Sequence, residues 1–216
     1  MEEKGFRQPG SPKPRPGSPE PGGFQVLPGT YKVVISLGRE MDSTFVMVKD
    51  DPRIGNQNEI KLAQRKMYDR LRKKADKLTE GMDRITEAEE VCNKMQAQLK
   101  GVEGKEVDSL RKTTTAMQDS LKFIREFISG KTSDRQGISR PPQITVTTIM
   151  QQAMQYIGSK QTIPGIQEEK LVTGAEEMIE QAVQRINGLF DGKWKAYRQQ
   201  VAGTKVNLFK EYKPIE

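Results

Sequence analysis

The stretch Val107–Ile128, VDSLRKTTTAMQDSLKFIREFI, decides the fold of this chain. Its apolar and small residues recur at alternating steps of three and four, a spacing that places them on one face of an α-helix. The members of this stripe are Val107, Leu110, Thr114, Met117, Leu121, Ile124 and Ile128. Because a helix buries such a stripe against another element, the spacing predicts a helix over residues 105–129 that packs lengthwise in a bundle.

Two other long stretches share this periodicity. The first begins near Gln57, and its stripe is Ile60, Met67, Leu71, Leu78, Met82, Ile85, Cys92, Met95 and Leu99. The last spans about 167–201, and its stripe is Val172, Ala175, Ile179, Ala182, Ile186, Leu189, Tyr197 and Val201. A shorter helix is predicted over 144–157, with Ile149, Ala153, Met154 and Ile157 pointing inward. The connections are short, so we predict a mainly α protein, an antiparallel bundle of three long helices and one shorter helix.

Several glycines bear on this bundle. Gly130 fits the C-cap of the helix over 105–129, and Gly158 fits the cap of the shorter helix. Gly81 falls inside the first helix, where glycine costs about 1 kcal/mol relative to alanine. Gly188 and Gly192 lie inside the last helix, where we expect them to let another helix approach closely.

Residues 26–53 have the pattern of β-structure. Tyr31, Val33, Ile35 and Leu37 alternate with other residues, which is typical of a strand with one covered face. A second β-rich run covers 44–49 after a break at 38–42, and Asp51-Pro52 ends it. The sequence therefore predicts a β-hairpin. A lone hairpin is marginally stable in water, so we expect it to need further strands or a helical face.

The N-terminal residues differ from the rest in composition. Seven of the 12 prolines lie in the first 28 residues, where apolar side chains are few. Such a segment has little to bury and is expected to be extended or disordered. The predicted organisation is a Pro/Gly-rich arm at 1–25, a hairpin at 26–53 and a helical bundle at 54–216. The closing residues, from Val206 to Ile215, are expected to form a docked tail.

Histidine is absent from all 216 residues. This absence removes Ser-His and Cys-His nucleophile systems, histidine-ligated zinc and the Glu-x-x-His di-iron site of helical bundles. The single cysteine, Cys92, lies on an apolar stripe and is predicted to be a buried core residue. We predict no catalytic, cofactor-binding or metal-binding residue in this chain.

The chain carries 36 Lys and Arg against 29 Asp and Glu, a net charge of +7. The two signs interleave except in a basic stretch at 61–77. Its candidate interaction residues are Lys61, Arg65, Lys66, Arg70, Lys73, Lys74 and Lys77. The simplest interpretation is a solvated helix face. The alternative is a surface that binds nucleic acid or another anionic polymer, which lacks the support of an aromatic platform or a zinc-finger spacing.

Three further motifs carry little chemistry. Gly130-Lys131-Thr132 resembles the end of a phosphate-binding loop, but Arg125 stands where that motif needs glycine. Adjacent acids at 89–90, 168–169 and 176–177 point about 100° apart on a helix, so we expect exposed surface there. Trp194 and Tyr197 are expected to be core at one end of the bundle, with a sugar-stacking platform as the alternative.

The given sequence also shows no membrane-spanning segment and no signal peptide. No apolar run approaches the roughly 20 residues that a membrane-spanning helix needs. The opening residues, Met1-Glu2-Glu3-Lys4, lack the apolar core of a signal peptide. The chain as given is therefore expected in the cytoplasm.

Two stretches together resemble a known family. Val26-Leu27-Pro28-Gly29-Thr30-Tyr31, with the second strand and Asp51-Pro52-Arg53, resembles the last hairpin of an immunoglobulin- or fibronectin-type sandwich, in which a tyrosine hydroxyl ties a turn. Trp194 followed by Val206-Asn207-Leu208-Phe209 and Lys213-Pro214-Ile215 resembles the C-terminal end of bacterial sortilin-like, BNR-repeat β-propeller proteins. Those proteins are often labelled glycosyl hydrolase or photosystem II assembly factor-like.

The resemblance implies the order propeller, small sandwich, helical bundle. This chain has no propeller repeats, so it resembles the C-terminal part of such a protein, and any hydrolase activity of a parent would lie in the absent propeller. The resemblance further implies an exported, periplasmic or cell-surface parent. The leading hypothesis is a non-catalytic accessory or protein-interaction region whose partner is the upstream propeller. A free-standing helical adaptor is the alternative.

Overall fold

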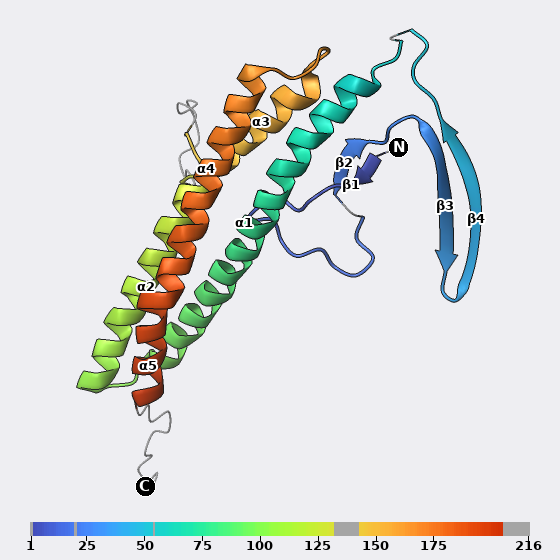
Figure 1. Ribbon diagram of the computed structural model, residues 1–216. Helices are drawn as coiled ribbons and strands as arrows, with labels where there is room; N and C mark the ends of the chain where they lie inside the picture. The colour runs from blue at the N-terminus through green and yellow to red at the C-terminus, as the bar shows by residue number, and fades with distance from the viewer. Residues whose placement is uncertain (1, 20, 54, 132–142, 205–216) are drawn as a thin grey trace, which may run out of the picture.

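The computed structural model describes residues 2–19, 21–53, 55–131 and 143–204. The predicted docked tail lies outside these residues. Four helices make up most of the described chain: α1 (Asn58–Leu99), α2 (Lys105–Ser129), α3 (Val146–Ser159) and α4 (Ile166–Leu189). A π-helical segment, η1 (Phe190–Trp194), continues α4 into α5 (Lys195–Gly203). The predicted mainly helical bundle with a β-hairpin is confirmed (Figure 1).

The helix lengths explain the layout of the bundle. α1 has 42 residues and α2 has 25, so at 1.5 Å per residue α2 covers little more than half of α1. The 14-residue α3 lies against the N-terminal part of α1, where the Gln64 side chain bonds the Ile157 carbonyl. Successive long helices run antiparallel, and α1 and α4 consequently run parallel, with Arg70 opposite Glu176 and Gly81 opposite Ile186.

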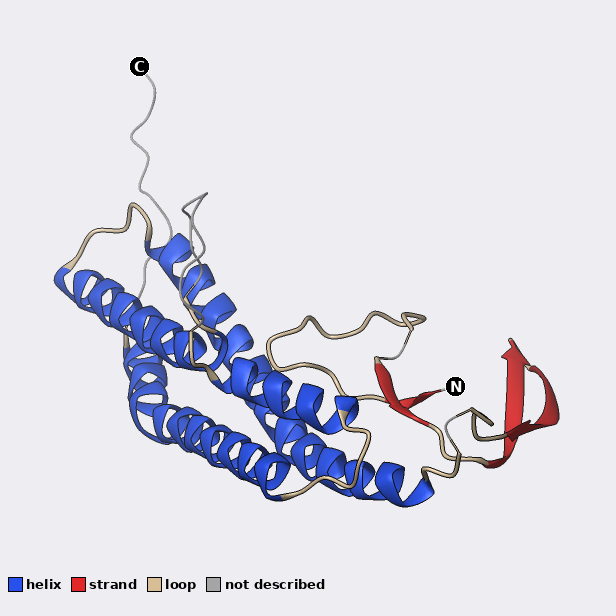
Figure 2. Cartoon of the chain, turned by 90° about the horizontal axis from the view of Figure 1, so that it is seen from above, coloured by secondary structure: helices blue, strands red, loops and turns tan. Residues whose placement is uncertain are grey.

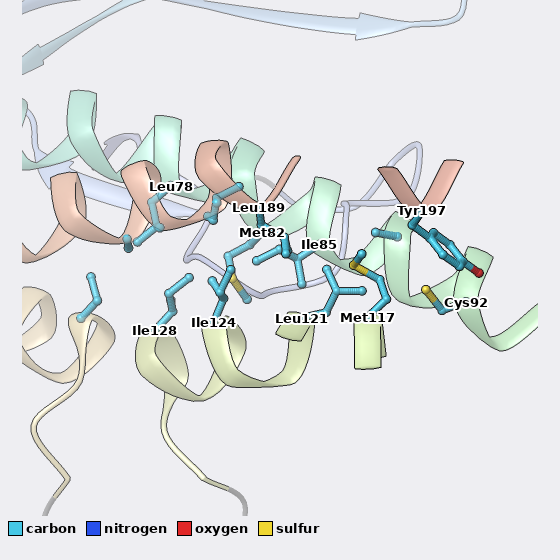
Figure 3. Packing of buried hydrophobic residues seen from close by; sticks show 14 of the residues in the cluster. Leu78, Met82, Ile85, Cys92, Met117, Leu121, Ile124, Ile128, Leu189 and Tyr197 are labelled. Atoms are coloured by element: carbon cyan, nitrogen blue, oxygen red, sulfur yellow. The ribbon is translucent and has the colours of Figure 1, made fainter. Parts of the chain in front are cut away.

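Most residues of the predicted stripes form the core, while four of them are half-buried: Ile60, Met67, Met95 and Val201. All seven residues of the α2 stripe are buried, and the α4 stripe is buried from Val172 to Leu189. Leu78, Met82 and Ile85 of α1 meet Leu121, Ile124 and Ile128 of α2 in one layer, which Figure 3 shows closely. A second, smaller cluster joins Leu71 to Ala153, Ile157, Val172 and Ala175. It holds α3 and the start of α4 against α1.

The glycine predictions are only partly right. Gly130 caps α2 with φ +84°, as expected. The expected close approach at Gly188 and Gly192 is wrong, because a Cβ at either position would meet nothing within 4 Å. The close approach is at Gly81, where a Cβ would lie 2.8 Å from the Ile186 Cδ1 atom. The helix-propensity cost of Gly81 therefore coincides with a close contact between α1 and α4.

Helix α3 starts and ends two residues later than predicted. Thr145 is its N-cap, since its hydroxyl accepts from the Thr148 amide while the Thr148 hydroxyl accepts from the Thr145 amide. The buried face is therefore Val146, Met150, Ala153 and Ile157, and the predicted inward residues Ile149 and Met154 are half-buried beside it. Gly158 lies within the helix and does not cap it.

The π-helical segment η1 interrupts the last helix at the point where its stripe changes register. Regular α-helical spacing from Leu189 would bring Lys193 onto the buried face four residues later. The extra residue in the π turn leaves Lys193 exposed and turns Trp194 toward the core, where it is half-buried. Tyr197 is then buried one turn further on.

The N-terminal arm differs most from the prediction. Residues 2–25 contain two short antiparallel strands, β1 (Glu2–Lys4) and β2 (Gly22–Gln25), and they lie along α1 (Figure 1). Phe6 is only 6% exposed and belongs to the main core cluster. The Arg7 side chain pairs with Asp83, and the Arg7 carbonyl accepts from the Thr79 hydroxyl at 3.0 Å. The expectation of an arm with little to bury is therefore wrong.

Candidate protein interaction surface

The most unusual surface of the described chain is the hairpin of β3 (Gly29–Leu37) and β4 (Glu40–Val48). Its ladder is continuous from Gly29 opposite Val48 to Leu37 opposite Glu40. The second strand begins four residues earlier than predicted, because a two-residue turn at Gly38 and Arg39 replaces the longer break. Gly38 has φ +63°, which suits the first central position of a type II′ turn. The hairpin projects away from the helices (Figures 1 and 2).

Both faces of this hairpin present apolar side chains to solvent. Directly paired residues point to the same face, so Tyr31, Val33, Ile35 and Leu37 share one face with Val46. The opposite face carries Val34, Met41, Phe45 and Met47. Phe45 is 70% exposed, and six other large apolar residues of the two strands are also exposed: Val34, Ile35, Leu37, Met41, Val46 and Met47. The strands pair only with each other among the described residues, so the outer edges of both lack ladder partners.

Local contacts order both ends of the hairpin, and one ion pair joins its base to α1. The Tyr31 hydroxyl donates to the Leu27 carbonyl at 2.6 Å, the turn-tying contact that the resemblance to a sandwich implied. After β4, the Asp50 carboxylate accepts from the Lys61 ammonium of α1 at 3.3 Å. The Arg53 guanidinium holds the pKa of the Asp51 carboxyl below its usual value.

The basic stretch at 61–77 is a helix surface of α1, as the simplest interpretation had it, and much of its charge is paired. Lys61 contacts Asp50 and Arg65 contacts Glu3. Arg70 lies between Glu169 and Glu176 of α4 with N–O distances of 2.5 and 2.7 Å, and Lys74 pairs with Glu180. Lys66, Lys73 and Lys77 are exposed and have no ion pair among the described residues.

These pairs align α1 with α4. The carboxylate of Glu176, and then that of Glu169, raises the pKa of Arg70 through hydrogen bonds. Lys74 lowers the pKa of Glu180 in the same way, and its own pKa is raised in return. The pairs are solvent-exposed, so their contribution to stability is modest. Their consequence for function is that half of the basic side chains at 61–77, those of Lys61, Arg65, Arg70 and Lys74, already have a carboxylate partner.

One acid that was expected on the exposed surface is buried. Glu168 is 2% exposed, and its carboxylate accepts from the Gly165 amide and from the Lys160 ammonium, both at 2.7 Å. The Lys160 contact is the main reason that the pKa of Glu168 is lowered. The signal for this role was present in the sequence, since a glutamate three residues after Gly165 opens the last helix as in a capping box.

Replacement of Glu168 by glutamine should weaken the protein and change its response to acid. A lowered pKa in the folded state gives stability that is present above pH 4.5, the ordinary value for a glutamate, and is lost as the pH falls below it. At pH 7 we expect Glu168→Gln to lower the melting temperature by roughly 2 to 4 °C, a typical cost of a lost cap. The deficit should shrink between pH 5 and pH 3. The exposed Glu177→Gln is the control, and a constant deficit across this range would contradict the assignment.

The aromatic end of the bundle is core. The Tyr197 hydroxyl lies 3.1 Å from the buried Thr114 hydroxyl, and its ring is 5.5 Å from that of Trp194. Cys92 is buried beside them, and burial raises the pKa of its thiol, as expected of a core cysteine. These contacts favour the core interpretation of Trp194 and Tyr197 over an open sugar-stacking platform.

No group of three or more acidic, cysteine or histidine side chains suited to a metal ion occurs among the residues that the structure describes. None of the described helices is both long and apolar enough to cross a membrane. Comparison with known protein families, curated proteins and solved structures finds no match to this chain.

Proposed function

We propose that this chain is a non-catalytic accessory region that docks onto another protein module through the β3–β4 hairpin, as the C-terminal part of a larger β-propeller protein. The observation that carries the proposal is the exposure of apolar residues on both faces of the hairpin. Contiguous exposed apolar surface on a folded protein marks an interaction site more often than not. The bundle then acts as a rigid support for that site.

The energetics of the hairpin support a partner with β-structure. Two isolated strands are marginally stable in water, and three or more strands with a covered face are needed for stability. Unpaired edges offer backbone N–H and C=O groups to a further strand, as in β-augmentation. The Tyr31 contact to the Leu27 carbonyl is of the kind that closes corners in β-sandwiches, so strands that complete a sandwich fit this hairpin best.

Hydrogen exchange should reveal the missing partner. In the chain alone, we expect amides of residues 30–48 to exchange orders of magnitude faster than those of residues 110–125 in α2, because the hairpin opens locally at little cost. Mass-spectrometric exchange of the same regions provides the comparison. Hairpin protection equal to that of α2 in a monomeric chain would mean that the hairpin needs no partner.

A photo-crosslinking experiment in the source cells tests the docking itself. A crosslinking residue replaces Ile35 on the hairpin, and the control chain carries it at the exposed Glu90 of α1. The proposal expects crosslinks from position 35, and not from position 90, to a β-sandwich or propeller module on the same or another polypeptide. Equal crosslinking from the two positions would contradict it.

A helical adaptor is the second candidate, and one groove favours it. Between α2 and α4 lies an open cavity of about 530 Å³ lined by Phe123, Ile124, Leu189 and Arg185. Phe123 is 64% exposed there, and the Arg185 guanidinium carbon lies 3.8 Å from the centre of the Phe127 ring. Crosslinks from position 123, and none from position 35, would favour the adaptor. The ion pairs along 61–77 weigh against an anionic-polymer binder, whose affinity would fall steeply with salt.

A further inference from the structure

A pocket separate from the hairpin lies where the arm meets the bundle. It has a volume of about 480 Å³, within the range of small-molecule sites. Strand β2 forms one wall, the N-terminal part of α1 a second and the C-terminal end of α3 the third. Its lining residues are Gly23, Phe24, Gln25, Gln57, Lys61, Gln64, Tyr68, Met154, Gly158, Lys160 and Gln161. None of these carries a negative charge.

Gln64 gives the pocket a fixed hydrogen-bond acceptor. The residue is 5% exposed, and its amide nitrogen donates to the carbonyls of Ile157 and Lys160, both at 2.8 Å. These two bonds use both donors of the amide and fix its orientation. Its carbonyl oxygen accepts no hydrogen bond from the described residues, although the residue lines the pocket. An accessible acceptor that is held in one orientation at the pocket wall is suited to a donor group on a ligand.

The apolar side of the pocket is aromatic. The rings of Phe24 and Tyr68 lie 5.5 Å apart at an angle of 55°, and Met154 adds a flexible apolar surface. Burial raises the pKa of the Tyr68 hydroxyl, which therefore stays protonated at neutral pH. Tilted aromatic rings of this kind attract another ring. Phe24 belongs to this wall only because the arm packs on α1.

Two ammonium groups complete the lining. Lys61 pairs with Asp50 and Lys160 with Glu168, and neither carboxylate lines the pocket. Each ammonium has three donors, so one carboxylate partner leaves donors for a ligand. An anionic group entering the pocket thus meets two cations and no lining carboxylate.

We propose that this pocket binds a small aromatic carboxylate that also carries a hydroxyl or amide donor. The ring packs against Phe24 and Tyr68, the donor bonds the Gln64 carbonyl, and the carboxylate lies near Lys61 and Lys160. The site is independent of the hairpin and of the proposed docking function. Because the arm supplies one wall, ligand binding also stabilises the docked arm.

Three matched probes test the chemistry by calorimetric titration of the full chain. 4-Hydroxyphenylacetate has the ring, the donor and the charge; phenylacetate lacks the donor, and 4-hydroxyphenylacetamide lacks the charge. We expect saturable binding of the first. Phenylacetate should bind at least about fivefold more weakly, because it has no donor for a hydrogen bond to the Gln64 carbonyl. 4-Hydroxyphenylacetamide should bind roughly two- to tenfold more weakly than 4-hydroxyphenylacetate. This difference in affinity should narrow at about 0.5 M salt, because salt screens the charge of the carboxylate.

A pair of glycine variants tests the location. A Cβ at Gly158 meets nothing within 4 Å, and this residue lines the pocket inside α3, so Gly158→Leu fills the pocket without removing the Gln64 bonds. Gly174→Leu is the matched control, a helical glycine in α4 with equally open space. Leucine is a better helix former than glycine, so neither variant should melt earlier than the parent. We expect Gly158→Leu to lose at least about tenfold in affinity, and Gly174→Leu to stay within about twofold.

Three outcomes would overturn this site. They are equal binding of the three probes, unchanged affinity of Gly158→Leu, and no saturation up to about 10 mM probe. A stable Gly158→Leu chain that loses binding, beside a Gly174→Leu chain that keeps it, supports the pocket. The result does not depend on whether the hairpin has a partner.

Discussion

Substitution of Leu121 by aspartate should unfold the helical bundle. Leu121 is fully buried in the layer between α1 and α2, close to Met82 and Ile85 (Figure 3). The described residues of this layer offer no cation to pair with a carboxylate there. An unpaired buried charge costs several kcal/mol, a large share of the 5–15 kcal/mol that stabilises a typical protein. We expect the helical circular dichroism signal at 25 °C to fall by more than about half.

The neighbouring residue provides the control. Lys122 is exposed on the same helix, one position further on, so Lys122→Asp introduces the same side chain outside the core. It should shift the free energy of unfolding by less than about 1 kcal/mol. A Leu121→Asp chain that melts within a degree or two of the parent would show that the α2 stripe faces solvent.

The helices were predictable because their signal is local. The three-and-four spacing in α2 repeats over seven positions, and the same seven residues are buried. Thr114 was correctly placed in this stripe despite its hydroxyl, which bonds the Leu110 carbonyl in its own helix. Periodicity of this kind needs no knowledge of the partner helix.

Features that depend on two distant segments were not predictable. Gly81 was read only as a weak helix former, whereas its role is set by Ile186, more than a hundred residues away. Gln64 gave no signal at all, since its importance comes from the carbonyls at the end of α3. The candidate pocket therefore cannot be found from the sequence, although one of its lysines, Lys61, belongs to the basic stretch.

The basic stretch illustrates the same limit for electrostatics. Counting charges along 61–77 identified a cationic segment but not its partners. Those partners are Glu3 and Asp50 on one side and three acids of α4, Glu169, Glu176 and Glu180, on the other. A helix pair aligned in parallel brings together residues about 100 positions apart. Surface charge becomes interpretable only after that alignment is known.

Substitution of Phe6 by alanine should destabilise the protein by up to about 3 kcal/mol. Composition suggested an expendable arm, because prolines and glycines dominate it. That reasoning missed a single aromatic residue that fills a place in the core beside Tyr68, with ring centres 5.7 Å apart. Truncation of a buried phenylalanine typically costs 3–5 kcal/mol. The free energy lost here cannot exceed the free energy that holds the arm on the bundle, because beyond that point the arm opens while the bundle stays folded.

The melting temperature of Phe6→Ala should accordingly fall, by no more than roughly 6 to 12 °C, at about 2–4 °C per kcal/mol for a protein of this size. Phe45→Ala truncates the same kind of side chain where it is 70% exposed, so this variant should melt within about 2 °C of the parent. Deletion of residues 1–24 should lower the melting temperature by about as much as Phe6→Ala does. Both changes remove the docked arm, and with it the ion pair of Arg7 with Asp83. A deletion that leaves the melting temperature unchanged would mean that the arm is not part of the folded core. The wall that Phe24 gives to the ligand pocket would be lost with it.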